Sequence, residues 1–515
     1  MVEGPLEIVL GARDSCKSMS NKPRAVVEYG DFQTPLALAR EVCALLRRRG
    51  VAPSSVLEPT CGKGHFLAAA GETFGEVREL FGLDINAAHV DAARTLLTGM
   101  SGHAEVRVVQ GDFFATDWEA ILTSLPEPLL IVGNLPWVTN AELGVVGSDN
   151  LPIKTNSGNQ RGLDAMTGKS NFDISEWMLN RMLDWVRMHE TTLAILCKSM
   201  VARKVLARAW RHGTSFGTAE MFTINAAAHF GVSVDACLLV VAAPSTTGKL
   251  TCDVYESLER DAASRSIGFH SGLLIANMDA FDRCSHLIGG ERSRWRSGIK
   301  HDCARVMELA EDGGRFSNGL GETVEIEPDC LYPMLKSSDV ANGRVEIPRR
   351  WMLVTQRHTG DRTETLAVRC PRTWSYLSRH ADLLNARASS IYRDRPPFAI
   401  FGVGEYSFSP WKIVISGLYK NLRFKVVGPF GGKPIVVDDT CYFYPCNSED
   451  EAVDVCRMLN SPVAQDFFSA FVFWDAKRPV NADLLRLLDV GALASHLGCN
   501  DATMHLPPSQ TALNV

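Results

Sequence analysis

An asparagine, a proline and a tryptophan lie together in the tetrapeptide Asn134-Leu135-Pro136-Trp137. The tetrapeptide follows the apolar run 129–133, which we expect to form a buried strand. The amide oxygen of Asn134 and the backbone carbonyl of Pro136 can accept hydrogen bonds from an amino group, and the ring of Trp137 can stack on a flat heterocycle. We therefore predict a site for an amine-bearing ring, with Asn134, Pro136 and Trp137 as its catalytic residues.

A glycine turn earlier in the chain has the properties of a binding site for a cationic nucleoside. Residues 56–66 combine an apolar strand, the turn Cys61-Gly62-Lys63-Gly64 and the start of a helix. Glycines allow the backbone to approach a ligand closely, and a helix start offers free N–H groups. Glu58 and Pro59 end the strand, and a carboxylate there suits a cation better than a pyrophosphate; the dinucleotide motif GxGxxG is absent. The sulfonium and ammonium groups of S-adenosylmethionine fit this site.

Two further acidic residues follow the next two candidate strands. Asp84, followed by Ile85, ends the second candidate strand, where an acid commonly accepts hydrogen bonds from ribose hydroxyls. A role for Asp84 as the N-cap of the next helix is the alternative. Asp112 can accept from an adenine amine while Phe113 packs on the ring. These residues, Glu58 and the tetrapeptide all lie at carboxyl ends of strands, where open α/β sheets bind ligands.

Short apolar strands alternate with helical segments from about residue 30 to residue 245. This alternation predicts βαβ units and a mostly parallel, doubly wound sheet, that is, a Rossmann-like α/β fold. Thr34 is a candidate N-cap, with Pro35 at the first helical position. We expect strands at 55–58, 80–84, 106–109, 129–133, 192–197 and 236–242, and helices at 35–48, 64–70, 86–98, 175–189 and 200–211.

The alternation ends near residues 244–248, where the sequence is Pro-Ser-Thr-Thr-Gly. Beyond this point Gly, Pro and aromatic residues are frequent, and short β-like runs occur at 399–403, 411–416, 424–427 and 435–437. We therefore expect an N-terminal extension at 1–28, an α/β domain at 29–245 and an α+β region at 246–515.

Composition sets broad limits on the function. The chain has 515 residues and a net charge of −6, so nucleic acid would have to bind at a local basic surface. The 14 cysteines include neither a CxxC pair nor a Cys/His cluster, so we expect no metal site and no disulfide framework. Apolar runs fall short of the roughly 20 residues of a membrane span. We expect a cytoplasmic protein without a membrane partner.

A long polar stretch rich in Gly, Asn, Ser and Thr interrupts the α/β pattern at residues 140–172. Loops of this length are often functional, although a disordered insertion is the alternative. We expect Lys154, Arg161 and Lys169 to contact the substrate, and Phe172 either to stack on the bound ring or to pack ahead of the next helix. Cations of the C-terminal region that could add a positive surface are Arg296, Lys300, Lys336, Lys412, Lys420, Arg423 and Lys425.

The ordered motifs resemble those of the gamma class of amino DNA methyltransferases, the adenine-N6 enzymes of restriction–modification systems. The resemblance begins at Phe32-Gln33-Thr34-Pro35 and covers residues 25–245. A looser resemblance to the C-terminal parts of large enzymes of this type covers 295–302, 331–339 and 401–408, which implies a target recognition region there. It also implies that S-adenosylmethionine contacts Phe32, Thr34, Pro35, Glu58, Pro59, Cys61, Gly62, Gly64, Asp84, Ile85, Asp112 and Phe113.

Two positions depart from Asn-Pro-Pro-Tyr, the commonest form of the catalytic motif in that class. Leu135 stands at the second position, which mainly shapes the turn, and Trp137 at the fourth position keeps an aromatic face. An Asn-Leu-Pro-aromatic motif also resembles the adenine dimethyltransferases of ribosomal RNA, but those are much shorter chains.

The resemblance implies a site-specific methyltransferase that acts on the N6 amine of an adenine flipped out of double-stranded DNA. A cognate restriction endonuclease or a defence-system subunit could accompany it. Methylation of RNA adenine or protein glutamine and a catalytically silent DNA-binding subunit are the alternatives. Cytosine-N4 methylation is disfavoured, because those enzymes more often carry Ser in place of Asn134. We do not expect a fused nuclease, because only about thirty residues precede the α/β core and no convincing nuclease motif follows it.

Overall fold

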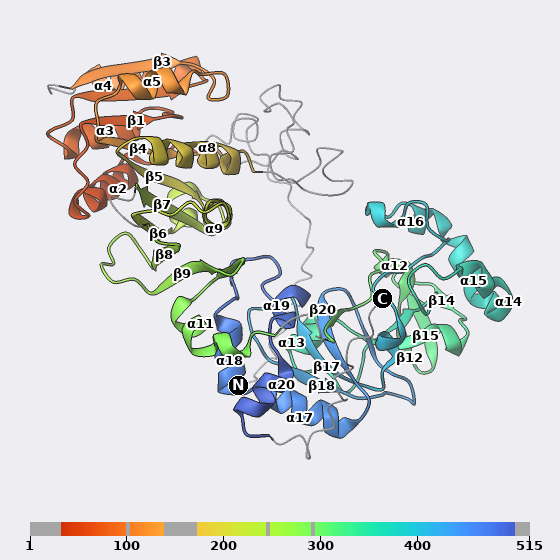
Figure 1. Ribbon diagram of the computed structural model, residues 1–515. Helices are drawn as coiled ribbons and strands as arrows, with labels where there is room; N and C mark the ends of the chain where they lie inside the picture. Colours follow the sequence, from red (N-terminus) through yellow and green to blue (C-terminus); the bar gives the residue numbers. More distant parts are fainter. Residues whose placement is uncertain (1–31, 99–103, 138–172, 244–247, 290–293, 500–515) are drawn as a thin grey trace, which may run out of the picture. The chain divides into compact units, whose positions relative to one another are not determined.

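The computed structural model describes residues 32–98, 104–137, 173–243, 248–289 and 294–499 (Figure 1). The chain divides into two compact units. The first comprises residues up to Lys249 together with Tyr255–Asp261, and the second comprises Leu250–Val254 and residues from Ala262 onward.

The first unit is built on a largely parallel sheet with the strand order β6-β7-β5-β4-β1-β2-β3. Pairs from β5 through β4, β1 and β2 to β3 are parallel, whereas β7 runs antiparallel to both β5 and β6. The direction of winding reverses between β1 and β4, at the kind of switch point where such sheets bind ligands. The strands are β1 (Ser55–Glu58), β2 (Glu79–Asp84), β3 (Glu105–Gln110), β4 (Leu129–Asn134), β5 (Thr191–Lys198), β6 (Thr218–Ile224) and β7 (Ala236–Ala242).

Helices cover this sheet and bury its central strands, which explains why those strands read as continuous apolar runs (Figure 1). Helices α2 to α4 share a core with alternate strand residues such as Val56 and Leu130. The next residue in each strand points to the other face, and α8 packs against α9 and β5. The helices are α2 (Leu36–Arg48), α3 (His65–Thr73), α4 (Ala87–Thr98), α5 (Trp118–Ser124), α8 (Ile174–Met188), α9 (Ser199–Arg211) and α10 (Ala226–Phe230).

The predicted α/β fold is confirmed, and the structure contains every strand and helix expected in this unit. Strand β6 and the short helices α5 and α10 were not predicted. Strand β6 escapes a hydrophobicity pattern because it contains Glu220, a buried carboxylate that accepts from the Tyr255 hydroxyl at 3.0 Å and pairs with Arg49 at 3.3 Å. The N-cap prediction for Thr34 is wrong, because Pro35 occupies that position without a side-chain cap.

The second unit has an α+β architecture. One 4-stranded antiparallel sheet has the order β11-β20-β17-β18, and a 6-stranded mixed sheet has the order β14-β13-β12-β16-β15-β19. Strand β9 (Arg265–His270) pairs antiparallel with β8 (Thr251–Tyr255) and with β10 (Leu273–Ile275). The two larger sheets contain β11 (Arg296–Ser297), β12 (Glu308–Asp312), β13 (Arg315–Asn318), β14 (Thr323–Val324), β15 (Leu331–Leu335), β16 (Arg350–Leu353), β17 (Trp411–Ser416), β18 (Lys425–Val427), β19 (Val436–Val437) and β20 (Cys441–Cys446).

Short helices surround these sheets. Of the predicted β-like runs, three correspond to β17, β18 and β19, whereas 399–403 is not a strand: Phe401 makes only an isolated bridge with Lys300. The α-helices are α11 (Met278–Cys284), α12 (Ala304–Met307), α13 (Ser337–Ala341), α14 (Leu366–Arg369), α15 (Pro371–Arg379), α16 (Ala381–Asn385), α17 (Glu449–Leu459), α18 (Pro462–Ser469), α19 (Ala482–Arg486) and α20 (Val490–His496).

Within the described ranges, no helix combines the length and apolar character that crossing a bilayer requires. The cysteines of these ranges are free thiols. The same part of the chain holds no group of three or more His, Cys, Asp or Glu side chains suited to a metal ion.

Candidate active site

A pocket of about 970 Å³, its open side included, lies at the carboxyl ends of β1, β2 and β4 and of the turn after β3. It brings together most of the predicted site residues, although they are far apart in sequence. Pro35, Gly64 and Trp137 do not line it, and Lys154, Arg161, Lys169 and Phe172 lie outside the described residues. The predicted residues on its wall are Phe32, Thr34, Glu58, Pro59, Cys61, Gly62, Asp84, Ile85, Asp112, Phe113, Asn134 and Pro136.

The amide of Asn134, at the end of β4, has a defined orientation. Its Nδ2 donates a hydrogen bond to the backbone carbonyl of Phe32 at 2.9 Å. Because a carbonyl can only accept, the nitrogen of the amide must face Phe32 and the oxygen must point the other way. That oxygen, Oδ1, is buried and accepts no hydrogen bond from the described residues. The site therefore presents a fixed, unused acceptor, which is what an amino group requires.

Residues after Asn134 hold the strand end in place. The Leu135 side chain is buried, and its backbone N–H donates to Leu196 O at 3.4 Å. The Trp137 ring is also buried, with ring centroids 5.8 Å from Phe32 and 5.1 Å from Phe230. Trp137 therefore packs behind the pocket, and its predicted stacking on a substrate ring stays a prediction.

Lys198, at the end of β5, bridges the two chain segments that flank residues 138–172. Its Nζ donates to Trp137 O at 3.2 Å and pairs with Asp173 Oδ2 at 2.7 Å. Asp173 is the N-cap of α8 and also accepts from the backbone N–H of Ser175 at 3.2 Å. Trp137, at the end of the tetrapeptide, is thus linked through Lys198 to the start of the helix that supplies Met178 to the pocket wall.

Glu58 places a buried carboxyl group on the pocket wall. Its Oε2 has no hydrogen-bond partner among the described residues. Burial raises the pKa of Glu58 well above its ordinary value, and the nearby Asp84 raises it further, which outweighs an opposing backbone hydrogen bond. A buried carboxyl without a cationic partner is costly to ionise, whereas a bound cation would stabilise its charged form.

Asp84 holds the glycine turn in place. Its Oδ2 accepts from the Gly62 N–H and its Oδ1 from the Asn86 N–H, both at 2.8 Å. Gly62 and Gly64 have φ angles of +50° and +78°, a region that favours glycine. A Cβ at Gly64 would lie 3.0 Å from the Cβ of Ala93 in α4, so Gly64 serves helix packing and not the pocket surface.

We expect Gly64→Ala to lower the melting temperature of the protein more than Gly50→Ala does. Both glycines have positive φ, but a Cβ at Gly50 would meet nothing within 4 Å. The control therefore carries the backbone penalty of about 1–2 kcal/mol alone, and Gly64→Ala adds the contact with Ala93. Equal melting temperatures for the two variants would show that α3 and α4 do not require this close approach.

Asp112 and Phe113 also line the pocket. Asp112 Oδ1 accepts from the Phe114 N–H at 2.9 Å. The buried Phe113 ring lies 5.1 Å from Trp118 and 5.9 Å from Trp185, and Trp118 Nε1 donates to Phe113 O at 2.8 Å. The aromatic packing fixes an apolar wall beside a carboxylate, as recognition of an amine-bearing base requires.

Comparison with known proteins identifies the family. The type II methyltransferase M.NspV from Nostoc sp. is 44% identical over 476 residues, which make up 92% of this chain and 98% of that protein. This chain belongs to the type II methyltransferases. No protein-family model matches it. Among solved structures, the type IIL restriction-modification enzyme MmeI in complex with DNA has a TM-score of 0.52 at 12% identity, covering 88% of this chain and 64% of that chain; this likeness concerns the fold.

The methyltransferase has the fold of S-adenosylmethionine-dependent enzymes, and its pocket residues fit that cofactor. Glu58 offers an unpartnered carboxyl to a cationic group. The Gln33 side chain lies against the turn at Gly62, where a Cβ would come 2.6 Å from its Oε1, so this position requires glycine. Asp84 and Asp112 present carboxylates at the ends of the next two strands, and Phe113 presents an aromatic ring. This set of charges and surfaces matches a molecule with a cationic end, a ribose and an adenine.

Several pocket residues of the methyltransferase were missed from the sequence. His65 is the clearest case: its Nδ1 lies 2.6 Å from Thr34 O, so Nδ1 carries the proton that links the 32–35 segment to α3. Its place directly after Gly64 was the available signal. No sequence signal pointed to Ile174 and Met178, because more than thirty residues separate them from the tetrapeptide 134–137 whose pocket they line. The lining residues not predicted are Gln33, Thr60, His65, Leu83, Asn86, His89, Gly111, Phe114, Ile174 and Met178.

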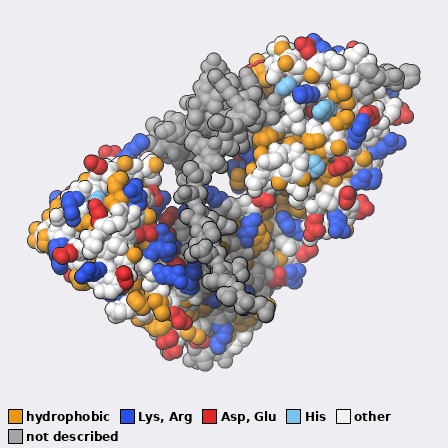
Figure 2. All heavy atoms as spheres, turned by 180° about the vertical axis from the view of Figure 1, so that it is seen from behind, with side chains coloured by type: hydrophobic (Ala, Val, Ile, Leu, Met, Phe, Trp, Pro, Cys, Tyr) orange, Lys and Arg blue, Asp and Glu red, His pale blue; other side chains and the backbone are white. Residues whose placement is uncertain are grey.

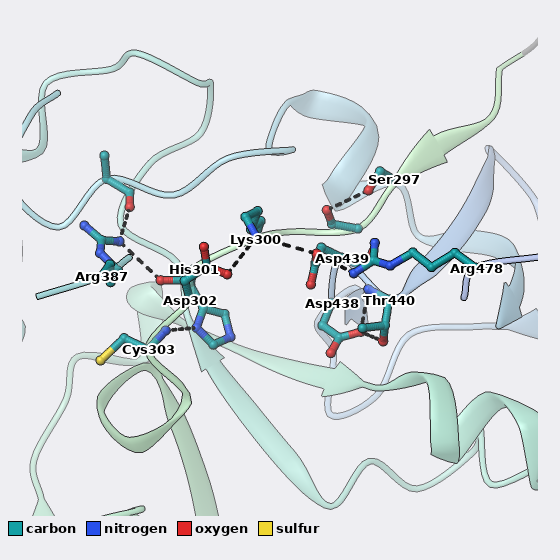
Figure 3. Close-up of polar contacts among 12 residues, drawn as sticks. Ser297, Lys300, His301, Asp302, Cys303, Arg387, Asp438, Asp439, Thr440 and Arg478 are labelled. Carbon is teal, nitrogen blue, oxygen red and sulfur yellow. Dashed lines mark hydrogen bonds and ion pairs between the residues drawn. The ribbon is translucent and has the colours of Figure 1, made fainter. Parts of the chain in front are cut away.

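The structure also tests the cations that we expected on the surface of the second unit. The prediction that Lys412 adds to a positive surface is wrong. Lys412 is 1% exposed in β17, its Nζ donates to Ser409 O at 2.5 Å, and burial lowers its pKa to about 7. Lys300 pairs with Asp302 at 2.8 Å and lies 3.9 Å from Asp439 (Figure 3). Lys336 pairs with Glu308 at 2.5 Å. Lys300 and Lys336 are therefore engaged by acids of their own unit.

Proposed function

We propose that this methyltransferase transfers the methyl group of S-adenosylmethionine to the N6 amine of an adenine flipped out of double-stranded DNA. The observation that carries the proposal is the buried, unpartnered Oδ1 of Asn134, on the wall of the same pocket as Glu58, Asp84 and Asp112. An oxygen that is held in one orientation and can only accept a hydrogen bond selects a substrate group that bears N–H. Adenine presents such an amine on a flat ring.

Asn134 and Pro136 would activate the amine by hydrogen bonding. The lone pair of an exocyclic amine is delocalised into the ring, which makes the nitrogen a poor nucleophile. Hydrogen bonds from its two N–H groups to Asn134 Oδ1 and to the Pro136 carbonyl would favour a tetrahedral nitrogen with a localised lone pair. The bound cofactor supplies an electrophilic methyl group on a sulfonium. Alignment of the amine with that methyl group would provide several kcal/mol of the rate enhancement. An N–CH3 bond would form as the S–CH3 bond breaks, with S-adenosylhomocysteine as the leaving group. The nitrogen, positively charged after transfer, would then lose one proton to solvent, so no strong base is needed in the motif.

Phe32 and Lys198 would act as positioning residues. The Phe32 carbonyl keeps the nitrogen of the Asn134 amide away from the substrate, because it accepts the Nδ2 hydrogen bond at 2.9 Å. Lys198 fixes the backbone just beyond Pro136 through its bond to Trp137 O at 3.2 Å. Both contacts restrict the catalytic turn before substrate binds, which lowers the entropic cost of reaching the reactive geometry.

The adenine must leave the helix stack to reach this pocket, because a paired base is held in the stack and one N–H of its exocyclic amine is used in the base pair. The fold is shared with MmeI, which was solved in complex with DNA, and this supports DNA as the polymer. We assign target recognition to the second unit. The same proposal includes stacking of the target base on Trp137 or Phe172 and contacts of the substrate with Lys154, Arg161 and Lys169. It also includes a cognate restriction endonuclease as a partner.

The methyl acceptor can be identified by mass spectrometry of the products. Purified protein would be incubated with deuterium-methyl S-adenosylmethionine in three separate reactions, which contain duplex DNA, RNA or a glutamine-containing protein. We expect labelled N6-methyladenine after digestion of the DNA to nucleosides. Label in N4-methylcytosine, in RNA or in methylglutamine instead would overturn the proposal, since each would mean that the Asn134 oxygen binds a different amine.

A further inference from the structure

The charge of the chain is unevenly distributed. Residues 344–395, which we call the arginine segment, contain eleven Arg, no Lys and five acidic residues, for a net charge of +6. The whole chain has a net charge of −6, so the remaining residues together carry −12. A basic segment in an otherwise acidic protein indicates an anionic partner at that place.

Most arginines of this segment are exposed and available. Arg350 and Arg387 are half-buried and engaged: Arg350 pairs with Asp339 at 2.9 Å, and Arg387 donates to three backbone carbonyls, among them Ala399 O at 2.7 Å. The exposed arginines that make no ion pair with any residue in the described ranges are Arg344, Arg349, Arg357, Arg369, Arg379, Arg393 and Arg395.

The fold presents part of this segment on a rigid helical surface. Helices α14, α15 and α16 follow one another at one edge of the second unit (Figure 1). Helix α15 buries Thr373, Tyr376 and Leu377, which leaves Arg372, Ser375 and Arg379 exposed at a spacing of one helical turn. This face therefore presents Arg379, which makes no ion pair within the described ranges, together with Ser375 and Arg372, which pairs with Glu327.

Glu327 fixes α15 to the rest of the unit. Its carboxylate accepts from the backbone N–H groups of Arg372 and Thr373, both at 2.8 Å, and from the Thr373 hydroxyl at 2.5 Å. Burial opposes ionisation of Glu327, but these hydrogen bonds outweigh it and lower the pKa to about 2. The helix is thus held in place at neutral pH, and its exposed arginines need not order the backbone when they bind a partner.

We propose that the exposed arginines Arg369 of α14, Arg379 of α15 and Arg393 of the loop that follows α16 bind the phosphate backbone of the duplex that carries the target adenine. The inference rests on the proposed function, because it names the surface by which the second unit holds DNA. Guanidinium groups suit phosphate, since each offers parallel N–H donors in a planar fork and keeps its charge. Figure 2 shows basic and acidic side chains interspersed on the face in view. The excess of positive charge is a property of the arginine segment, with its net charge of +6.

The test is the salt dependence of duplex binding by a variant with Arg369→Gln, Arg379→Gln and Arg393→Gln. Each phosphate contact contributes about 0.9 to the slope of log affinity against log salt concentration. We therefore expect the slope to fall by about 2–3 and the affinity at low salt to fall about 10-fold or more, equally for cognate and unrelated sequences. The triple variant should keep its melting temperature and its affinity for S-adenosylmethionine.

A matched control replaces Arg457 and Arg486, which are exposed arginines of the same unit outside the segment, each paired with an acid three residues before it in sequence. Their replacement by Gln should leave the slope unchanged. An unchanged slope in the triple variant would overturn the inference while leaving adenine methylation standing. Conversely, a reduced slope together with methyl transfer to another acceptor would retain the inference on DNA binding and overturn the proposed base.

Discussion

Asn134→Ala is expected to lower the rate of methyl transfer about 1,000-fold or more while S-adenosylmethionine still binds with nearly unchanged affinity. The substitution removes Oδ1, a buried acceptor that has no partner among the described residues and whose direction is set by the hydrogen bond from Nδ2 to the Phe32 carbonyl. The cofactor surface at Glu58, Asp84 and Asp112 remains. Single-turnover methylation would measure the rate, and calorimetry would measure cofactor binding.

Two further variants separate the chemical role of Asn134 from a structural one. In Asn134→Asp an oxygen would replace Nδ2 and face the Phe32 carbonyl, so the side chain would keep an acceptor but lose its orientation; we expect most of the activity to be lost. Asn180→Ala is the matched control, because the Asn180 amide bonds to Glu176 O at 2.7 Å within α8 and lies off the pocket wall. It should stay within about twofold of the parent. Full activity of Asn134→Ala would contradict the mechanism.

Glu58→Gln is expected to weaken S-adenosylmethionine binding about 10- to 100-fold, the range for loss of a hydrogen bond to a charged group. Burial and Asp84 raise the pKa of Glu58, so the apo protein holds a proton there that the unfolded chain releases. Folded-state stability from this group is therefore lost as pH rises from the ordinary carboxyl range toward the raised pKa. A bound cation favours the ionised form of Glu58 and so releases the proton. The affinity of the parent protein for S-adenosylmethionine should therefore rise as the pH rises through the same window.

The Glu58→Gln variant should lose this pH dependence and melt at a higher temperature in the apo state near neutral pH. Calorimetry in buffers of different ionisation enthalpy would count the proton that the parent releases. Glu79→Gln is the control: burial also raises the pKa of Glu79, but that residue pairs with Arg107 at 3.2 Å and does not line the pocket. Its substitution should alter stability without altering cofactor affinity. Unchanged cofactor binding and proton release in Glu58→Gln would exclude a cationic partner for this carboxylate.

The α/β core was predictable because its strands are buried on both faces and therefore read as apolar runs. Strand β6 was not, since the partners that stabilise its buried Glu220, Arg49 and Tyr255, lie far away in sequence. The site residues were predictable as strand-end motifs. The orientation of the Asn134 amide was not, because it depends on a carbonyl 102 residues away.

Charge was the least predictable property, because residue type does not reveal burial or pairing. Lysine is usually a surface residue, yet β17 pairs with strands on both sides and its Lys412 side chain is buried. Arginines of the 344–395 segment, in contrast, are spread over loops, short helices and the start of β16, so no single sequence pattern groups them. Their shared exposure is visible only in the structure.

Single-molecule sequencing of DNA from cells that express the protein tests the central claim most directly. The parent protein is expected to leave N6-methyladenine at one recurrent sequence, and the Asn134→Ala variant, at equal expression, is expected to leave none. N4-methylcytosine in place of N6-methyladenine, the absence of any modified base with the parent, or the same adenine modification with the Asn134→Ala variant would contradict the account.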